Sequence, residues 1–260
     1  MADRARAGSL LLAGKVRVGI GDGARLDRKP GELVPADIDV AIDEPPPYVG
    51  RGGHKLAAAL DAFGIAPAGR VCLDVGASTG GFTDVLLQRS ASRVYALDVG
   101  RGQLAEPLRT DPRVVSMERT NARALTAGSL PEPISLAVID VSFISLERII
   151  APVASVFAPA GGDIVALVKP QFEAPRGSAV KGVVRDPAVH RAVLEDVVAA
   201  AAAAGLTPRD VAVSPIEGAD GNREFLLWLT VPAGTVAGGD RPPTTVASSV
   251  GPSIARVTGP

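Results

Sequence analysis

Two lysines and two acidic residues are the side chains of this sequence best placed to move a proton. Asp140 and Lys169 each directly follow an apolar run, and Glu224 directly precedes one. The carboxyl ends of neighbouring parallel strands meet at one edge of a sheet, where ligands bind. A last strand that runs antiparallel begins at that same edge, and Lys55 opens a helix before the first strand. We therefore expect these four side chains to surround one site.

A lysine in such a site can act as a general base towards a hydroxyl group. A ribose hydroxyl is a poor nucleophile, so its proton must be removed as the oxygen attacks a methyl group. Burial and a second cation nearby, here Lys55, favour the neutral amine that Lys169 would need. Asp140 and Glu224 would orient the two amines. The alternative interpretation is that Lys169 is only one partner of a structural ion pair.

The elements that would position these residues are organised around the glycine-rich segment that follows the apolar run 71–75. Helical spacing resumes after the glycines, and Ser78 or Thr79 is expected to cap that helix. The dinucleotide fingerprint needs a second glycine at the position that Ser78 occupies. Asp74 suits a cationic ligand group, and Asp98, at the end of the next strand, suits two ribose hydroxyls. This pattern favours S-adenosylmethionine over NAD, and a purely structural turn is the remaining alternative.

The rest of the chain alternates strands with helices, which is typical of an α/β fold. We expect strands at 71–75, 93–98, 114–117, 136–140, 164–169, 209–214 and 225–231, and helices at 55–63, 79–89, 102–109, 145–158 and 187–204. This order predicts a Rossmann-like, seven-stranded, mostly parallel sheet. Residues 215–223 are too few for a helical crossover, so the last strand should run antiparallel.

Four regions follow from the pattern along the chain. Residues 1–44 form a small α+β segment with a helix over 2–13 and two short strands. Residues 45–53 form a proline-rich linker, residues 54–231 form the main domain, and residues 232–260 form a tail that is expected to be disordered because it is rich in Pro, Gly, Thr, Ser and Val.

Composition narrows the possible functions. The formal net charge of the 260 residues is −1 at pH 7, so contacts with RNA must come from local basic patches. The lone Cys72 fits a reducing cytoplasm, and the isolated His54 and His190 do not suggest a metal site. No apolar segment reaches the roughly 20 residues that a membrane-spanning helix needs.

Several segments resemble the TlyA (hemolysin A) family of ribosomal RNA ribose 2′-O-methyltransferases, which share an FtsJ-like catalytic domain. These segments are 48–56, 73–84, 96–100, 140–145, 167–173, 181–186 and 221–225. The resemblance implies a class I methyltransferase in which Lys55, Asp140, Lys169 and Glu224 form a catalytic tetrad, with Lys169 as the general base. The cofactor-binding residues that we expect are Asp74, Gly76, Ala77, Ser78, Thr79, Gly80, Phe82, Asp98, Asn121 and Asp140.

The resemblance also implies an acceptor and an RNA-binding module. The acceptor would be a cytidine of 16S and, in some members, 23S rRNA within ribosomal subunits. Residues 2–42 resemble the latter part of an S4-type RNA-binding module, and residues 170–185 form either an RNA-contacting lid or a plain loop. The RNA-binding residues that we expect are Arg4, Arg6, Lys15, Arg17, Arg51, Arg176, Lys181 and Arg185.

Other function classes stay open at this point. The first is a methyltransferase with a non-ribosomal acceptor, the second is a dehydrogenase, and the third is a membrane-lytic protein, as the older family name suggests. The sequence offers no basic amphipathic helix with aromatic anchors for membrane lysis. We expect a cytoplasmic enzyme that needs no metal ion, and the oligomeric state is left open.

Overall fold

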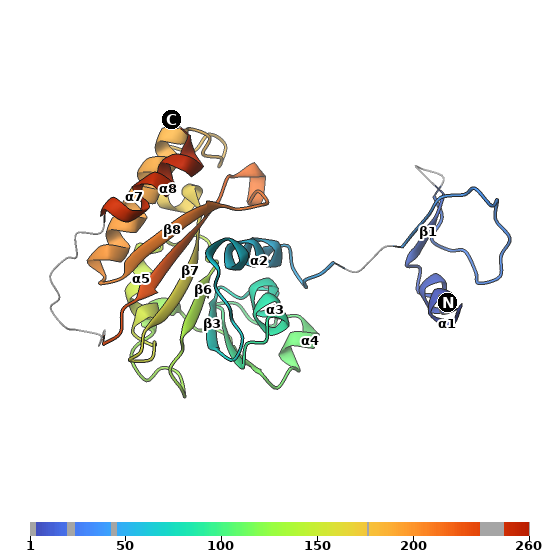
Figure 1. Cartoon of the computed structure of the whole chain (residues 1–260), viewed down its shortest axis with the longest axis horizontal. Coiled ribbons are helices and arrows are strands. Elements are labelled where there is room, and N and C mark those ends of the chain that lie inside the picture. Colours follow the sequence, from blue (N-terminus) through green and yellow to red (C-terminus); the bar gives the residue numbers. More distant parts are fainter. Residues whose placement is uncertain (1–3, 20–23, 43–45, 176, 235–246, 260) are drawn as a thin grey trace. The chain divides into compact units, whose positions relative to one another are not determined.

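The chain folds into two compact units, Met1–Pro47 and Tyr48–Pro260. The computed structural model describes residues 4–19, 24–42, 46–175, 177–234 and 247–259 (Figure 1). The boundary between the units falls inside the linker expected at 45–53, but its last residues belong to the second unit, where the first helix already begins at Gly52.

The first unit consists of a helix and a two-stranded antiparallel sheet. Its elements are α1 (Arg4–Leu12), β1 (Val16–Val18) and β2 (Val40–Ile42), and the strands pair with Val16 opposite Ile42. Val16 and Val18 are buried, whereas all of β2 is exposed. The described part of this unit therefore has only a small apolar core.

The second unit is built on a seven-stranded sheet with strand order β5-β4-β3-β6-β7-β9-β8. The strands are β3 (Val71–Val75), β4 (Arg93–Leu97), β5 (Val114–Met117), β6 (Leu136–Ile139), β7 (Gly162–Val168), β8 (Thr207–Val213) and β9 (Phe225–Val231). Neighbours from β5 to β7 pair in parallel, and β9 runs antiparallel to both β7 and β8. This confirms the predicted fold class and the antiparallel last strand.

Helices cover both faces of this sheet, as Figure 1 shows. The helices α2 (Gly52–Phe63), α3 (Gly81–Gln88) and α4 (Glu106–Arg109) pack on one face, and α5 (Glu147–Ala154), α7 (Pro187–Ala203) and α8 (Ala247–Thr258) on the other. Short helices α6 (Pro170–Glu173), η2 (Ala122–Ala124) and η3 (Ala219–Gly221) lie in the connections. Along β3 the apolar side chains alternate between the two cores, since Cys72 faces α2 and α3 while Leu73 and Val75 face the opposite layer.

The expected cap of α3 is wrong. The helix begins at Gly81, and its N-cap is Gly80 at φ 98° without a side-chain cap. A left-handed backbone at this position suits glycine, which has no Cβ to clash. The helices expected at 102–109 and 145–158 are also shorter than predicted, as α4 and α5 show.

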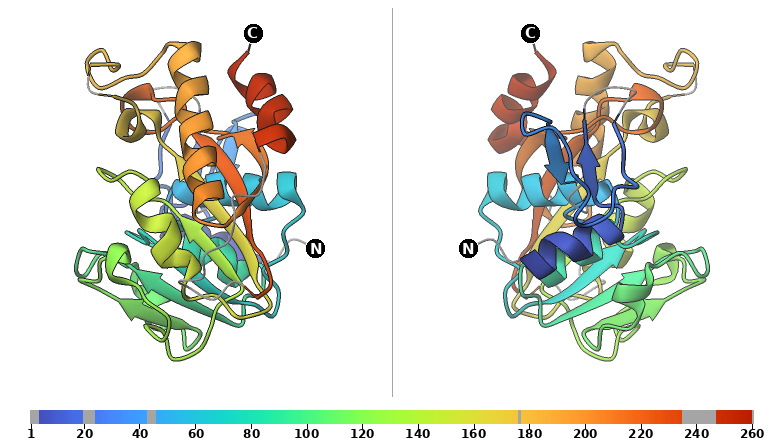
Figure 2. Two further views of the ribbon diagram at one scale, coloured as in Figure 1. Left: turned by 90° about the vertical axis from the view of Figure 1, so that its left-hand side faces the viewer. Right: turned by 90° about the vertical axis from the view of Figure 1, so that its right-hand side faces the viewer.

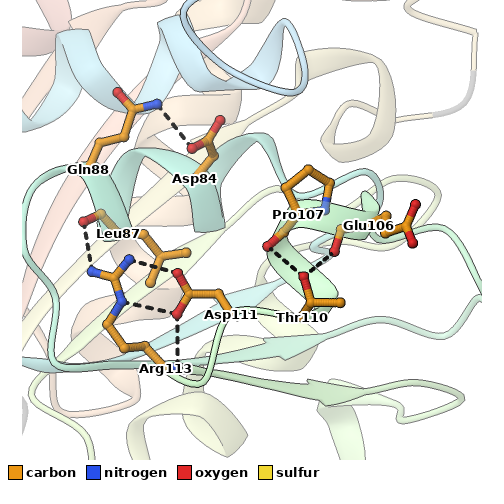
Figure 3. A network of polar contacts seen from close by, with 8 residues as sticks. All are labelled: Asp84, Leu87, Gln88, Glu106, Pro107, Thr110, Asp111 and Arg113. Atoms are coloured by element: carbon orange, nitrogen blue, oxygen red, sulfur yellow. Dashed lines mark hydrogen bonds and ion pairs between the residues drawn. The ribbon is translucent and has the colours of Figure 1, made fainter.

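A network of polar contacts fixes the far end of α3 (Figure 3). The Arg113 guanidinium donates to the Asp111 carboxylate and to the carbonyl oxygen of Leu87, the latter at 3.3 Å. On the exposed side of the same helix, Gln88 Nε2 donates to Asp84 Oδ1 at 3.0 Å. These contacts hold α3 against the start of β5, so the glycine turn at the other end of α3 has a fixed support.

The prediction of a disordered tail is wrong for residues 247–258, which form α8. Val250, Ile254 and Val257 are buried, and α8 packs against α7 and β8, with α7 and α8 side by side in the left panel of Figure 2. Arg256 also forms an ion pair with Asp210 of β8 at 3.0 Å. Residues 235–246 of the predicted tail lie outside the described residues.

Candidate active site

The turn after β3 is held tightly against the ends of two neighbouring strands. The backbone N–H groups of Gly76 and Ala77 both donate to the carbonyl oxygen of Leu97, at 2.8 and 3.1 Å. Gly76 has φ 85°, and a Cβ at this position would overlap the carbonyl oxygen of Asp140. Only glycine satisfies both conditions, so the backbone at the end of β6 can approach the turn closely.

A cavity of about 1170 Å³ opens at the carboxyl ends of β3, β4 and β6. Its lining includes five of the expected cofactor-binding residues, namely Gly76, Ser78, Asp98, Asn121 and Asp140. Ala77, Thr79 and Phe82 line a pocket of about 140 Å³ that shares Gly76, Ser78 and Asp140 with the large cavity. This is the topological switch point of the sheet, where α/β proteins bind their ligands.

Asp98 lies at the edge of the cavity with both carboxylate oxygens engaged. Oδ2 accepts a hydrogen bond from the backbone N–H of Ser78 at 2.8 Å, and Oδ1 accepts one from Gly100 at 2.7 Å. Each oxygen of a carboxylate can accept a second hydrogen bond. The side chain can therefore still receive a pair of ligand hydroxyl groups.

Asp74 does not line either of these pockets. It is fully buried on the α3 side of the sheet, where Thr83 Oγ1 donates to its Oδ2 at 2.7 Å. Burial, together with the negative charges of Asp140 and Asp98, raises the pKa of Asp74 from 3.8 to about 7, against the opposing effect of the hydrogen bond from Thr83. Asp74 thus supports the turn from behind, and its role in donor binding stays a prediction.

We expect the buried Asp74 to make stability depend on pH. Between the unfolded-state pKa near 3.8 and the folded-state pKa of about 7, the native protein holds a proton that the unfolded chain has lost. The free energy of unfolding should therefore fall as pH rises through this range, by about 4 kcal/mol at most, and level off above it. Urea unfolding of donor-free protein at several pH values measures this slope, and Asp74→Asn should reduce it.

The control for that experiment is Asp61→Asn. Asp61 is exposed, and a hydrogen bond from Arg89 lowers its pKa, so its titration lies below the relevant range. An unchanged slope in Asp74→Asn would contradict the assignment of the proton to Asp74.

The expected tetrad residues form two buried ion pairs at the carboxyl edge of β6 and β7. Lys169 Nζ lies 2.5 Å from Asp140 Oδ1, and Lys55 Nζ pairs with Glu224 Oε2. The register of β7 and β9 places Val168 opposite Phe225. Lys169 directly follows Val168 and Glu224 directly precedes Phe225, so both residues lie at this end of the two strands. Side-chain exposure is 11% for Lys169, 10% for Lys55 and 2% for Glu224, against 21% for Asp140. Each amine is thus largely removed from water and held beside a carboxylate.

A hydroxyl group and an aromatic ring lie beside the Lys169 amine, a second ring contacts the first, and the sequence did not indicate them. Lys169 Nζ donates to Ser142 Oγ at 3.0 Å and lies 6.0 Å from the centre of the Phe172 ring. Phe143 has φ 65°, is 89% exposed, and contacts Phe172 with ring centres 4.9 Å apart. Ser142, Phe143 and Phe172 all line the cavity, so an apolar surface adjoins the amine.

The segment before α2 fixes the position of Lys55. The backbone N–H of Val49 donates to Asp84 Oδ2 of α3 at 2.8 Å. The Tyr48 ring lies so close to Gly53 that a Cβ there would overlap it, and the Tyr48 and His54 rings meet edge to face at 5.4 Å. The start of α2 is therefore held against the glycine turn.

The structure describes only part of the expected RNA-binding set. Lys15 and Arg17 are exposed on the first unit, and Arg51, Lys181 and Arg185 are exposed on the second. The side chains of Arg4 and Arg6, and all of Arg176, lie outside the described residues. In the described part of the chain, no helix is both long and apolar enough to cross a membrane.

Comparisons with known proteins identify the class. Residues 48–231 match the FtsJ-like methyltransferase family. With its strand order and its cavity at the carboxyl edge, the second unit is a class I methyltransferase domain.

The relatives then identify the family. The chain is 48% identical over 229 residues to the 16S/23S rRNA (cytidine-2′-O)-methyltransferase TlyA of Mycobacterium tuberculosis, with 87% of this chain and 84% of that protein covered. It is 40% identical over 232 residues to Hemolysin A of Brachyspira hyodysenteriae, with 88% and 94% covered. The solved structure of a hemolysin-named protein from Streptococcus thermophilus is 41% identical, covers 98% of this chain and 90% of its own, and has a TM-score of 0.74. The chain belongs to the TlyA family of FtsJ-like methyltransferases.

Proposed function

We propose that this protein is an S-adenosylmethionine-dependent ribose 2′-O-methyltransferase that acts on cytidine in 16S and also 23S rRNA. The observation that carries the proposal is the buried pair of Lys169 and Asp140 beside a cavity that a glycine turn lines. The relative named as a 16S/23S rRNA (cytidine-2′-O)-methyltransferase supports the acceptor. A cytoplasmic location would follow from a ribosomal substrate.

The donor side of the cavity fits a cationic nucleoside better than a phosphate ligand. Asp98 and Asp140 place carboxylates in the lining, and Asn121 adds a side-chain amide. Ser78 occupies the place where a pyrophosphate site needs glycine. When bound, S-adenosylmethionine supplies an electrophilic methyl group. Asp98 would receive its ribose hydroxyls, and Gly76 and Ser78 would contact it through the backbone.

The acceptor chemistry rests on Lys169. The ribose 2′-hydroxyl would be the nucleophile towards the methyl group that the donor supplies, and neutral Lys169 Nζ would accept the hydroxyl proton. Asp140 and Ser142 hold Nζ at the cavity edge and stabilise the ammonium group that forms. Lys55, held by Glu224, supplies a second positive charge behind the site. Ring surfaces of Phe143 and Phe172 would position the acceptor nucleotide.

The first unit would supply contacts with the RNA backbone. We propose that it is the latter part of an S4-type module and that Lys15 and Arg17 contact phosphates, as would Arg51, Lys181 and Arg185 on the second unit. We propose the same role for Arg4, Arg6 and Arg176, for which the sequence is the sole support. Such contacts fix the orientation of the substrate without reading its sequence.

We expect Asp98→Ala to weaken donor binding by about 10–150-fold, because a carboxylate then no longer accepts from the donor ribose or fixes Ser78. Calorimetric titration with S-adenosylmethionine measures the effect. Glu106→Gln, an exposed acid on neighbouring α4, is the matched control and should leave the affinity unchanged. Undiminished affinity in Asp98→Ala would remove Asp98 from the donor site.

Transfer of tritiated methyl groups from S-adenosylmethionine to 30S, 50S and 70S particles that lack the modification tests the function. We expect label at a ribose 2′-oxygen of cytidine, and nuclease digestion followed by chromatography locates it. If the protein binds S-adenosylmethionine but labels none of these particles, the ribosomal acceptor is contradicted. That result would favour a methyltransferase with a non-ribosomal acceptor. Lysis of membranes by pure Lys169→Ala protein would instead support the membrane-lytic interpretation.

A further inference from the structure

A buried amide joins two loops that are distant in the chain. Asn222 is 1% exposed and precedes β9. Its Oδ1 accepts a hydrogen bond from the backbone N–H of Val184 at 3.1 Å, and its Nδ2 donates to the carbonyl oxygen of Gly182 at 2.9 Å. On α7, His190 Nε2 contacts the carbonyl oxygen of Val184 at 2.9 Å, so Nε2 carries the proton. The backbone around Val184 is therefore held from both sides.

The loop that this amide holds, residues 177–185, closes one side of the cavity. Gly177, Ala179 and Val184 are in the cavity lining, together with Ser142 and Phe172, which contact the Lys169 amine. The loop thus shares the cavity lining with Ser142 and Phe172, the two residues beside the Lys169 amine, where we place the acceptor nucleotide.

The tip of this loop is a tight, hydrogen-bonded turn that carries the exposed Lys181. Val180 and Val183 exchange two backbone hydrogen bonds of 3.0 and 3.1 Å. Lys181 and Gly182 between them have φ 50° and 80°, as in a two-residue hairpin turn. Lys181 and Arg185 are exposed, and the upstream end of the connection is fixed by Glu173, whose Oε1 accepts from the backbone N–H of Leu146 at 2.9 Å.

Asn222 also belongs to the segment that carries the tetrad carboxylate. Its carbonyl oxygen accepts from the backbone N–H of Gly218 at 2.8 Å. Gly218 packs so closely on the Glu224 carboxylate that a Cβ would overlap Oε1. One short segment therefore places Glu224 against Lys55 and, two residues earlier, fixes the loop 177–185.

We propose that Asn222 is a positioning residue that sets the place of the loop 177–185 over the acceptor side and thereby determines the affinity for RNA. This inference rests on the proposed function. Asn222 would act on RNA-backbone binding through Lys181 and Arg185, which the loop carries. Binding of S-adenosylmethionine would not depend on Asn222.

The test compares wild type, Asn222→Ala and His190→Leu, with Gln88→Ala as the matched control. Gln88 is an exposed amide whose bond to Asp84 lies on α3 (Figure 3). Limited trypsin digestion with mass spectrometry gives the rate of cleavage after Lys181 and Arg185. In Asn222→Ala we expect about 30-fold faster cleavage, because two neutral hydrogen bonds that hold the loop are lost. His190→Leu, which removes one bond from the opposite side, should give a smaller increase, and Gln88→Ala none.

The second readout separates positioning from a merely structural role. For methylation of ribosomal particles, we expect the KM of Asn222→Ala for RNA to rise about tenfold, with kcat and the Kd for S-adenosylmethionine nearly unchanged. Unchanged cleavage and KM in both loop variants would overturn the proposal, as would equal losses of donor and RNA binding. If wild type methylates no ribosomal particle, the proposed function fails, and the cleavage rates alone still decide whether Asn222 holds the loop.

Discussion

Replacing Lys169 by alanine is expected to lower the rate of methyl transfer by about 10²–10⁴-fold, the usual contribution of a general base. Donor affinity should stay unchanged, because Lys169 lies outside the lining that Asp98 and the glycine turn form. Single-turnover methylation of ribosomal particles measures the first quantity, and calorimetric titration with S-adenosylmethionine measures the second.

Lys169→Arg is the sharper variant for the same question. Arginine keeps a positive charge beside Asp140 and Ser142, but it cannot lose its proton in a protein and so cannot act as the base. We expect this variant to be as stable as wild type and as inactive as Lys169→Ala. Turnover in Lys169→Arg near the wild-type rate would show that Lys169 acts only through its charge, as in the ion-pair interpretation.

Breaking the pair of Lys55 and Glu224 is expected to produce the largest loss of stability. Glu224→Ala leaves the buried Lys55 ammonium without its carboxylate, and the free energy of unfolding should fall by about 3–5 kcal/mol. Methyl transfer should fall with it. Urea unfolding at constant pH, with methylation measured on the same preparation, gives both quantities.

A double variant separates stability from function at this pair. In Lys55→Met/Glu224→Leu both buried charges are replaced by apolar groups, so stability should return to about the wild-type value while activity stays lost. Asp61→Ala is the matched control, since it breaks the exposed pair with Arg89 and should cost about 1 kcal/mol or less. Recovery of methyl transfer in the double variant would show that the pair serves only the fold.

The sheet was predictable because most of its strands are largely apolar runs that end near a charged or glycine residue, β8 with Arg209 and Asp210 being the exception. Leu136–Ile139 before Asp140 and the run before Lys169 locate the carboxyl edge without any tertiary information. The short connection before β9 requires the antiparallel direction. The meeting of Asp140, Lys169 and Glu224 at one edge follows from these features, since strand ends and strand direction together determine which residues are neighbours.

Other features depend on information that a strand pattern does not contain. The role of Asp74 in donor binding stays a prediction, whereas its burial beside Thr83 follows from alternation along β3, which places it on the same face as Cys72, towards α3. For α8, the helical spacing of Val250, Ile254 and Val257 was present in the sequence, and the surrounding Ser, Gly and Pro residues obscured it. The contacts of Asn222 and Glu173 join loops with no periodic pattern, so only the folded structure brings them together.

The position of β9 between β7 and β8 determines how much of the chain must be synthesised before the protein can be active. The described cavity lining ends at Val184, whereas Glu224 lies 169 residues after its partner Lys55. As the chain leaves the ribosome, the segments that shape the donor side appear well before the carboxylate that neutralises Lys55. The final hairpin must then insert one strand beside β7. We therefore expect catalytic competence to appear only after Glu224 and β9 have been synthesised, which keeps a shorter nascent chain from acting on RNA.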